Sequence, residues 1–310
     1  MAERRTNRSG GISLLLGAAC LFLAAPVMAQ GVVVIKSHDL EPFNQALAGF
    51  VAACNEQITE YNLRGNDKTG ASILTRLSAA KPKLILALGA LAAQVVKDRI
   101  QDVPVVFSMV SSPQQYGLSG DNIAGISLDI PVETQLARFK ALVPTIRTIG
   151  ALYDPEKTGA MVEAAQVVAD TFGLQLLAAP VASPKEVPTA LRSLLGKIDA
   201  LWMLPDNTVV TPKSFDFLLM TAFEQHLPFL AVSDIFVEVG ALAALSPDYV
   251  DVGRQACQLA RDLARDRRSL SAGQVLPPAK VNLAVNLKTA SRLGLTLPAD
   301  ILQTASKVYR

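Results

Sequence analysis

The feature that most constrains the fold is an alternation of short, wholly apolar segments with segments of helical periodicity. The apolar segments are rich in β-branched residues, which is typical of strands buried on both faces of a parallel sheet. In the first half, strands are expected at Val32–Lys36, Leu84–Leu88 and Val103–Val110, and helices at Phe43–Cys54 and Leu91–Asp98. The pattern predicts βαβ units and therefore an α/β fold.

The alternation restarts in the second half of the chain. Strands are expected at Ile146–Tyr153, Leu174–Ala178, Ala200–Leu204 and Phe229–Val232, with helices at Ala160–Phe172, Lys185–Leu195 and Lys213–His226. Residues 81–107 and 196–231 also resemble each other. In both, a charged turn, an apolar strand and a helix lead to a strand that starts apolar-Pro-apolar. Two similar Rossmann-like lobes with doubly wound parallel sheets are therefore predicted.

The last part of the chain departs from this alternation of strands and helices. Residues Asp248–Arg265 predict a long amphipathic helix, and Val281–Asn286 alternates like a half-buried strand. The tail from Leu287 to Arg310 predicts two short helices that are interrupted near Pro298.

The first 29 residues predict an export signal. Three arginines, at positions 4, 5 and 8, precede the apolar run Ile12–Ala25, and small residues follow up to Ala29. That order is typical of a secretory signal peptide cleaved after Ala29, which places the mature protein in the periplasm. A membrane anchor is the alternative, but the run is shorter than the ~20 residues of a spanning helix. Lipid anchoring through Cys20 is a further alternative, but the residues before Cys20 match a lipobox poorly.

Two cysteines follow the signal segment, Cys54 and Cys257. Both lie in apolar helical contexts, so the sequence leaves open whether they are buried thiols or a disulfide. No CxxC motif or Cys/His cluster is present, and no metal site is expected.

Charge and motifs exclude several classes of function. The signal segment carries the whole formal charge of +2, so the rest of the chain has no basic excess to attract nucleic acid. No GxSxG, GxxxxGK[ST] or strand-associated GxGxxG motif occurs, and no enzyme activity or cofactor is expected. The alternative is a hydrolase or isomerase that uses His38 with Asp39 or Glu41.

Ligands of doubly wound sheets bind outside the carboxyl ends of the strands. Polar or small residues follow several predicted strands and are the candidates for ligand contact. In the first lobe these are Ser37, His38, Asp39, Gly89, Ala90, Ser108, Ser111 and Ser112. In the second lobe they are Tyr153, Asp154, Asp206, Asn207, Ser233 and Asp234. Helix capping is the competing role for Ser37 and Asp39, and the start of a turn before Pro155 is the competing role for Asp154.

Several segments resemble the ABC transporter substrate-binding family, in the branch that includes tryptophan- and tyrosine-uptake binding proteins. They are residues 103–110, 122–127, 204–207, 240–245 with 248–249, 253–256, and 286–287 with 293–298. The chain departs from the family at Ala124, where a Thr is usual, at Ser112, where an Asp is usual, and in the loop 36–42.

The resemblance implies a type I periplasmic-binding-protein fold, with three hinge crossings between two lobes that close on a ligand. We expect residues 30–126 plus 247–272 in the N-terminal lobe and 127–246 plus 273–310 in the C-terminal lobe. The implied function is capture of a small polar metabolite, amino acids first, by a monomer that delivers it to an ABC transporter permease. A periplasmic ligand-sensing module for a membrane receptor is the alternative.

Overall fold

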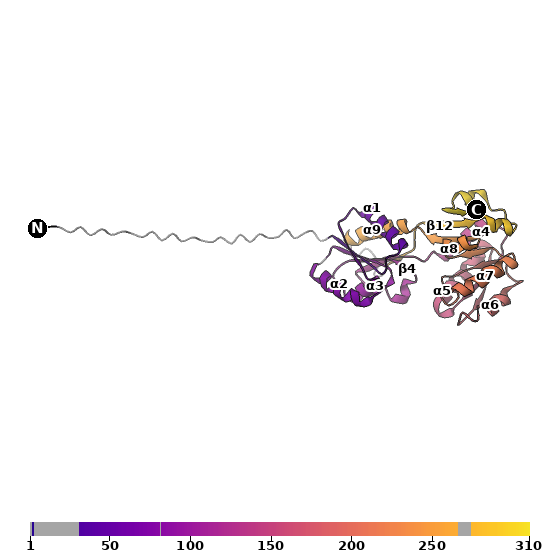
Figure 1. Ribbon diagram of the computed structural model, residues 1–310, viewed down its shortest axis with the longest axis horizontal. Coiled ribbons are helices and arrows are strands. Elements are labelled where there is room, and N and C mark those ends of the chain that lie inside the picture. The colour runs from indigo at the N-terminus through magenta and orange to yellow at the C-terminus, as the bar shows by residue number, and fades with distance from the viewer. Residues whose placement is uncertain (1, 3–30, 81, 266–273) are drawn as a thin grey trace. The chain divides into compact units, whose positions relative to one another are not determined.

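The computed structural model describes residue 2 and residues 31–80, 82–265 and 274–310. The predicted signal peptide therefore lies outside the described residues. Within residues 31–310 the strands form two sheets, and each sheet carries helices on both faces (Figure 1). The α/β fold with two doubly wound, mainly parallel sheets is confirmed. None of the described helices is both long enough and apolar enough to span a bilayer.

The first sheet has the strand order β11-β5-β4-β3-β1-β2, and all of its strands are parallel. Its strands are β1 Val32–Lys36, β2 Ile58–Asn62, β3 Leu84–Leu88, β4 Val105–Val110, β5 Ile123–Ser127 and β11 Val275–Leu276. Every residue of β1, β3, β4 and β5 is buried. Helices cover both faces of these strands, which explains why their sequences are continuous apolar runs rather than alternating ones.

Two pairs of helices cover this sheet (Figure 1). Helices α1 Glu41–Cys54 and α9 Tyr249–Arg265 pack on one face, and α2 Asp67–Ala80 and α3 Ala90–Lys97 pack on the other. A 3₁₀ turn, η1 Pro113–Tyr116, follows β4.

The second sheet has the order β7-β6-β8-β9-β10-β12-β13. Its strands are β6 Thr148–Tyr153, β7 Gln175–Pro180, β8 Ala200–Trp202, β9 Phe229–Ala231, β10 Ala243–Pro247, β12 Val281–Asn286 and β13 Lys307–Tyr309. Neighbouring strands of this sheet are parallel except β10 and β12, which are antiparallel. β13 in turn runs parallel to β12. The tail contains the two predicted helices, but it also contains β13, which the sequence pattern did not predict.

The helices of the second sheet also form two layers. One layer contains α4 Val132–Leu142, α5 Pro155–Ala169 with the 3₁₀ turn η2 Asp170–Phe172, and α10 Leu287–Arg292; α11 Ala299–Gln303 packs at its edge. The other contains α6 Val187–Leu194, α7 Pro212–Glu224 and α8 Asp234–Val239. Both layers are held by apolar clusters, and the buried Trp202 lies in the first of them.

The predicted internal repeat is confirmed by the topology. The first five strands of each sheet occupy equivalent places, β2-β1-β3-β4-β5 in one and β7-β6-β8-β9-β10 in the other. The two similar sequence stretches thus correspond to β3–β4 and β8–β9, the third and fourth strands of each sheet.

The chain passes three times between the sheets. The crossings are residues 128–131 between β5 and α4, residue 248 between β10 and α9, and residues 277–280 between β11 and β12. The second and third crossings are joined by a backbone hydrogen bond, in which the N–H of Asp248 donates to the carbonyl oxygen of Lys280 at 3.0 Å.

The predicted bounds of the second lobe differ from the structure in one place. The sequence placed residues 273–310 in the second lobe, whereas β11 pairs with β5 of the first sheet. A two-residue strand leaves no periodic signal that could mark this return.

Helices α1 and α9, which are far apart in the sequence, pack with their backbones in contact. A methyl group on Gly49 would collide with the carbonyl oxygen of Val250, and one on Gly253 with that of Ala46. At the far end of the contact Cys54 and Cys257 form a disulfide, with their Cα atoms 5.6 Å apart. The sequence left open whether these cysteines are buried thiols or a disulfide, and in the structure they form a disulfide.

Removing this disulfide should destabilise the protein strongly. The cross-link joins residues 203 positions apart, so it restricts the unfolded chain over a long loop. We expect the double variant Cys54→Ser, Cys257→Ala to lose about 3–5 kcal/mol of unfolding free energy in urea denaturation. The wild-type protein in reducing agent is the control and should show a comparable loss. A loss below ~1 kcal/mol would show that the glycine contact alone holds the two helices.

Candidate functional site

The carboxyl ends of the strands in both sheets border one cavity of about 190 Å³. It is lined by segments that follow β4, β8 and β9, by the first crossing, by the end of β10 and by the start of α9. The lining residues are Ser111, Leu128, Asp129, Ile130, Gln135, Met161, Pro205, Ala231, Val232, Leu245, Pro247 and Tyr249. This is the edge at which open α/β sheets bind ligands.

The lining is mostly apolar, with a few polar groups placed among apolar side chains. Asp129 is its one charged residue, and no lysine or arginine lines the cavity. Both carboxylate oxygens of Asp129 accept the backbone N–H of Ser112, at 2.8 and 3.1 Å. The N–H of Asp129 in turn donates to the hydroxyl of Ser127 at 2.8 Å. These bonds fix the carboxylate at the first crossing, where it supplies negative charge beside an apolar wall.

The end of β4 has an irregular backbone next to this carboxylate. Its register with β5 shifts between Phe107 and Val110, as in a β-bulge. Met109 and Ser112 adopt positive φ angles of 60° and 48°, which side chains larger than glycine seldom occupy. Bulges and left-handed residues gather near binding sites, where they redirect side chains.

Ser108 lies within the same irregular stretch. Its hydroxyl is fully buried and has no hydrogen-bond partner among the residues that the structure describes. A buried hydroxyl without a partner costs about 1–3 kcal/mol, so it is an uncommon feature of a buried strand.

Tyr249 is the first residue of α9 and closes the cavity at the second crossing. Burial raises the pKa of its phenol above the usual value, and the negative charge of Asp234 raises that pKa further. The phenol is therefore neutral at physiological pH and offers an O–H group beside an apolar ring face.

Gln135 joins the cavity wall to the core of the second sheet. Its amide Nε2 donates to the carbonyl oxygen of Ile130 at 2.8 Å, and its Oε1 accepts the indole N–H of Trp202 at 3.0 Å. Trp202 is buried in the core of the second sheet. Gln135 thus links the end of the first crossing, at Ile130, to the core of the second sheet.

The structure brings Asp154 and Asp206 together at the ends of neighbouring strands. Asp206 is 1% exposed, and Oδ2 accepts the N–H of Asp154 at 2.7 Å and the hydroxyl of Thr158 at 2.6 Å. Its Oδ1 accepts the N–H of Thr208 at 2.9 Å. The carboxylate thus has both oxygens committed to protein donors, and it does not line the cavity.

Asp154 belongs to the same network. Its side chain caps α5 by accepting the N–H of Glu156 at 3.0 Å, and it also accepts the hydroxyl of Thr208 at 2.7 Å. The Thr208 bond and then the Glu156 bond lower the pKa of this carboxyl. Lys157 donates to the side chains of Asn207 and Thr208, so Asn207 faces a cation of its own lobe.

The first-lobe candidates fall into two groups. The hydroxyl of Ser37 accepts the N–H of Ala92 at 2.9 Å in the first turn of α3, next to Gly89, whose φ is +93°. Ser37, Gly89 and Ala90 thus form one strand-end cluster. Asp39 instead pairs with Lys36 at 3.2 Å and is largely exposed.

The remaining candidates lie around the same edges. Of all the residues predicted from the sequence, only Ser111 lines the cavity, although Ser112 bonds to its carboxylate. Tyr153 ends β6 against the core, and His38 contacts the turn at Gly65. Ser233 and Asp234 begin α8, where Asp234 pairs with Lys307 at 3.0 Å.

Sequence reasoning missed Asp129, Gln135, Met161, Pro205 and Tyr249 as cavity residues. Asp129 and Tyr249 lie on or next to crossing segments, which carry no periodic signal, and Gln135 and Met161 lie within helices α4 and α5. It also passed over Lys36, a buried lysine that ends β1 and pairs with Glu60 at 2.6 Å. Burial would lower the pKa of Lys36, but hydrogen bonds to Glu60 and Asp39 outweigh burial and raise it. A lysine inside an otherwise apolar strand was the available signal.

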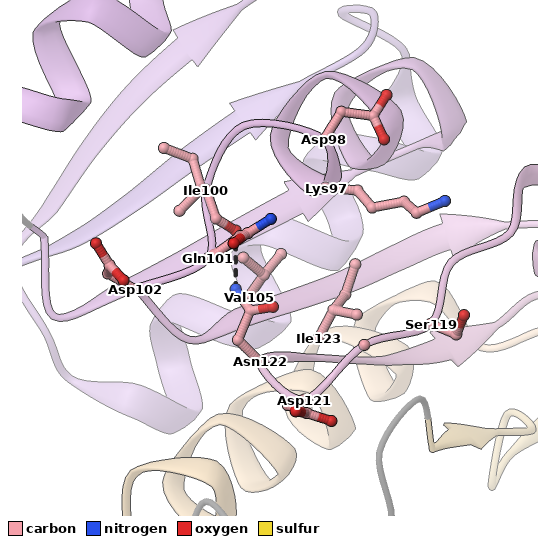
Figure 2. A pocket seen from close by; sticks show the side chains of 11 residues that line it. Lys97, Asp98, Ile100, Gln101, Asp102, Val105, Ser119, Asp121, Asn122 and Ile123 are labelled. Atoms are coloured by element: carbon pink, nitrogen blue, oxygen red, sulfur yellow. Dashed lines mark hydrogen bonds between the residues drawn. The ribbon is translucent and has the colours of Figure 1, made fainter.

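A larger hollow of about 630 Å³ lies at the opposite edge of the first sheet (Figure 2). It borders the starts of β4 and β5 at Val105 and Ile123, together with Lys97, Asp121 and Asn122. The amide of Asn122 donates to the carbonyl oxygens of Ile100 and Val103, so it serves the local turn. None of the residues predicted for the site lines this hollow. In the described part of the chain no His, Cys, Asp and Glu side chains cluster as a metal site would require.

Comparison with known proteins agrees with the fold. The family model described as "ABC transporter substrate binding protein" matches residues 43–309, which is most of the chain. The chain therefore belongs to the ABC transporter substrate-binding protein family.

One curated relative is a tyrosine-binding protein from Clostridioides difficile (strain R20291), 27% identical over 220 residues. The match covers 68% of this chain and 63% of that relative, so it spans less than two thirds of the relative's length.

Two solved structures share the fold. One is a domain in complex with L-Trp from Streptococcus pneumonia, 24% identical, with a TM-score of 0.59 over 89% of this chain and 99% of that one. The other is a ligand-free, open substrate-binding protein with adhesive properties from Clostridium difficile. It is 23% identical, with a TM-score of 0.75 over 90% of this chain and 98% of that one.

Removing the Asp206 carboxylate should affect stability before it affects binding. Asp206→Ala leaves buried donors at Asp154, Thr158 and Thr208 without an acceptor, so we expect a loss of about 3 kcal/mol or more in urea denaturation. Asp216→Ala, an exposed position on α7, is the matched control and should change stability by less than ~0.5 kcal/mol. If both substitutions changed the unfolding free energy by the same small amount, Asp206 would not have this structural role, and it would again be a candidate for ligand contact.

Proposed function

We propose that the chain is an exported binding protein that captures an amino acid in the strand-end cavity and delivers it to an ABC transporter permease. The observation that carries the proposal is the Asp129 carboxylate, held in place by the Ser112 N–H at the edge of an apolar cavity. The family membership and the tyrosine and L-Trp named for its relatives support this class of ligand.

The cavity offers a suitable place for each part of an amino acid. Asp129 pairs with the ammonium group, because a charge-assisted hydrogen bond to a fixed carboxylate is strong and directional. The hydroxyl of Ser111 and neighbouring backbone N–H groups receive the carboxylate. Met161, Ile130 and the ring of Tyr249 surround the side chain, which favours an apolar or aromatic one.

The strand-end residues predicted from the sequence act in two ways in this proposal. Ser111 contacts the ligand directly, and Ser112 holds the Asp129 carboxylate in place. Asp154 and Asp206 shape the second-lobe wall through the bonds described above. The three crossings act as hinges, and the protein closes on its ligand as a monomer.

Export and the absence of catalysis belong to the same proposal. The basic, apolar and small residues at the start of the chain favour a cleaved signal peptide. The Cys54–Cys257 disulfide supports an oxidising compartment such as the periplasm. The cavity lining contains no histidine or cysteine, so it lacks an acid–base or nucleophilic pair of the usual kind, and we propose that the ligand leaves unchanged.

Replacing Asp129 tests the proposal directly. With L-tyrosine and L-tryptophan as ligands in isothermal titration calorimetry, Asp129→Ala should weaken binding by about 10- to 100-fold, because it removes a charge-assisted hydrogen bond. The matched control is Asp121→Ala at the opposite edge of the sheet, which should bind like the wild type. Unchanged affinity in Asp129→Ala, with the protein folded, would contradict this role of the cavity.

Hinge closure has its own test. Small-angle X-ray scattering at saturating amino acid should show a smaller radius of gyration than the ligand-free protein, since the lobes close over the bound ligand. The Asp129→Ala variant at the same ligand concentration is the control and should remain less compact. An unchanged scattering profile for a protein shown to bind would reject the clamshell mechanism.

A further inference from the structure

A second cavity, of about 240 Å³, lies away from the strand-end site. It borders the amino ends of the central strands of the first sheet, at Val32, Leu84 and Pro104, and the last two turns of α9. Its lining residues are Val32, Cys54, Glu56, Lys83, Leu84, Pro104, Ala260, Arg261, Ala264 and Arg265. Because it lies at the amino ends of these strands, it is separate from the proposed amino-acid site at their carboxyl ends.

The cavity combines an apolar interior with an excess of positive charge. Side chains of Val32, Leu84 and Ala260 are buried, and they belong to the apolar layer between the sheet and α9. Three cations, Lys83, Arg261 and Arg265, border this interior, and Glu56 is the one carboxylate among the lining residues. The local excess is informative because the chain without its signal segment carries almost no net charge.

The cations differ in how far they are already engaged. Lys83 pairs with Glu56 at 2.6 Å, and one Nη of Arg261 donates to the carbonyl oxygen of Ala53 at 2.7 Å. Arg265 makes no ion pair among the residues that the structure describes, and it is exposed at the end of α9. The remaining donors of both arginines are arranged one helical turn apart, a spacing that suits one shared anion.

From this charge complementarity we propose that the cavity binds a free apolar carboxylate, such as a short fatty acid. The hydrocarbon part occupies the space between Val32, Leu84 and Ala264. The carboxylate pairs with Arg265 and Arg261, whose planar guanidinium groups match its geometry.

A titration with octanoate, followed by calorimetry and by amide chemical shifts, tests this site. Binding should perturb residues around Ala260 and Ala264. Affinity should rise by about fourfold for each methylene from butanoate to octanoate, since each buries more apolar surface. Acetate supplies the charge without the chain, and 1-octanol the chain without the charge; both should bind at least about tenfold more weakly than octanoate.

Variants separate this site from the strand-end cavity. Arg265→Glu should weaken octanoate binding by about tenfold or more, and Ala264→Phe, at an exposed position, should block the cavity. Arg138→Glu is the control, because it makes the same charge change at an exposed position on α4. Asp129→Ala should leave octanoate binding unchanged.

Three results would overturn the proposal. The first is no octanoate binding by the folded wild-type protein, and the second is wild-type affinity in both Arg265→Glu and Ala264→Phe. The third is octanoate-induced amide shifts around Asp129 and Tyr249 in place of Ala260 and Ala264, which would put the fatty acid in the strand-end cavity instead.

Discussion

The contact between α1 and α9 is the interaction on which the first sheet and its hinges depend. It joins a helix near the start of the chain to one that follows the second crossing. Gly49 and Gly253 allow the two backbones to touch, and the Cys54–Cys257 disulfide closes the far end of the contact. Because α9 begins at Tyr249, this contact also fixes one wall of the strand-end cavity.

Much of the fold could be predicted because buried parallel strands leave a strong signal in the sequence. The predicted bounds of β1, β3 and β12 agree with the structure residue for residue. β2 was missed because Ile58–Asn62 is an edge strand with two exposed positions, and its sequence is mostly polar. The two-residue β11 and the terminal β13 are too short for any periodicity, so their pairing depends on tertiary contacts.

The site was harder to predict than the fold. The sequence argument led to the edge of each sheet that borders the cavity, but it could not tell which polar residues are already hydrogen-bonded within the protein. Asp154 and Asp206 bind each other's segments, whereas Asp129 lies on a crossing that no pattern marks. A carboxylate at a strand end thus indicates the functional edge, and only its hydrogen-bond partners decide whether it is available to a ligand.

The central claim is that the strand-end cavity holds an amino acid through Asp129, and a crystal structure with L-tyrosine or L-tryptophan tests it most directly. The account predicts ligand density between Asp129, Met161 and Tyr249, with the ammonium nitrogen about 2.7–2.9 Å from a carboxylate oxygen of Asp129. Density elsewhere, such as at the hollow near Lys97 and Asn122, would contradict it. So would a ligand in the cavity whose ammonium group lies away from Asp129.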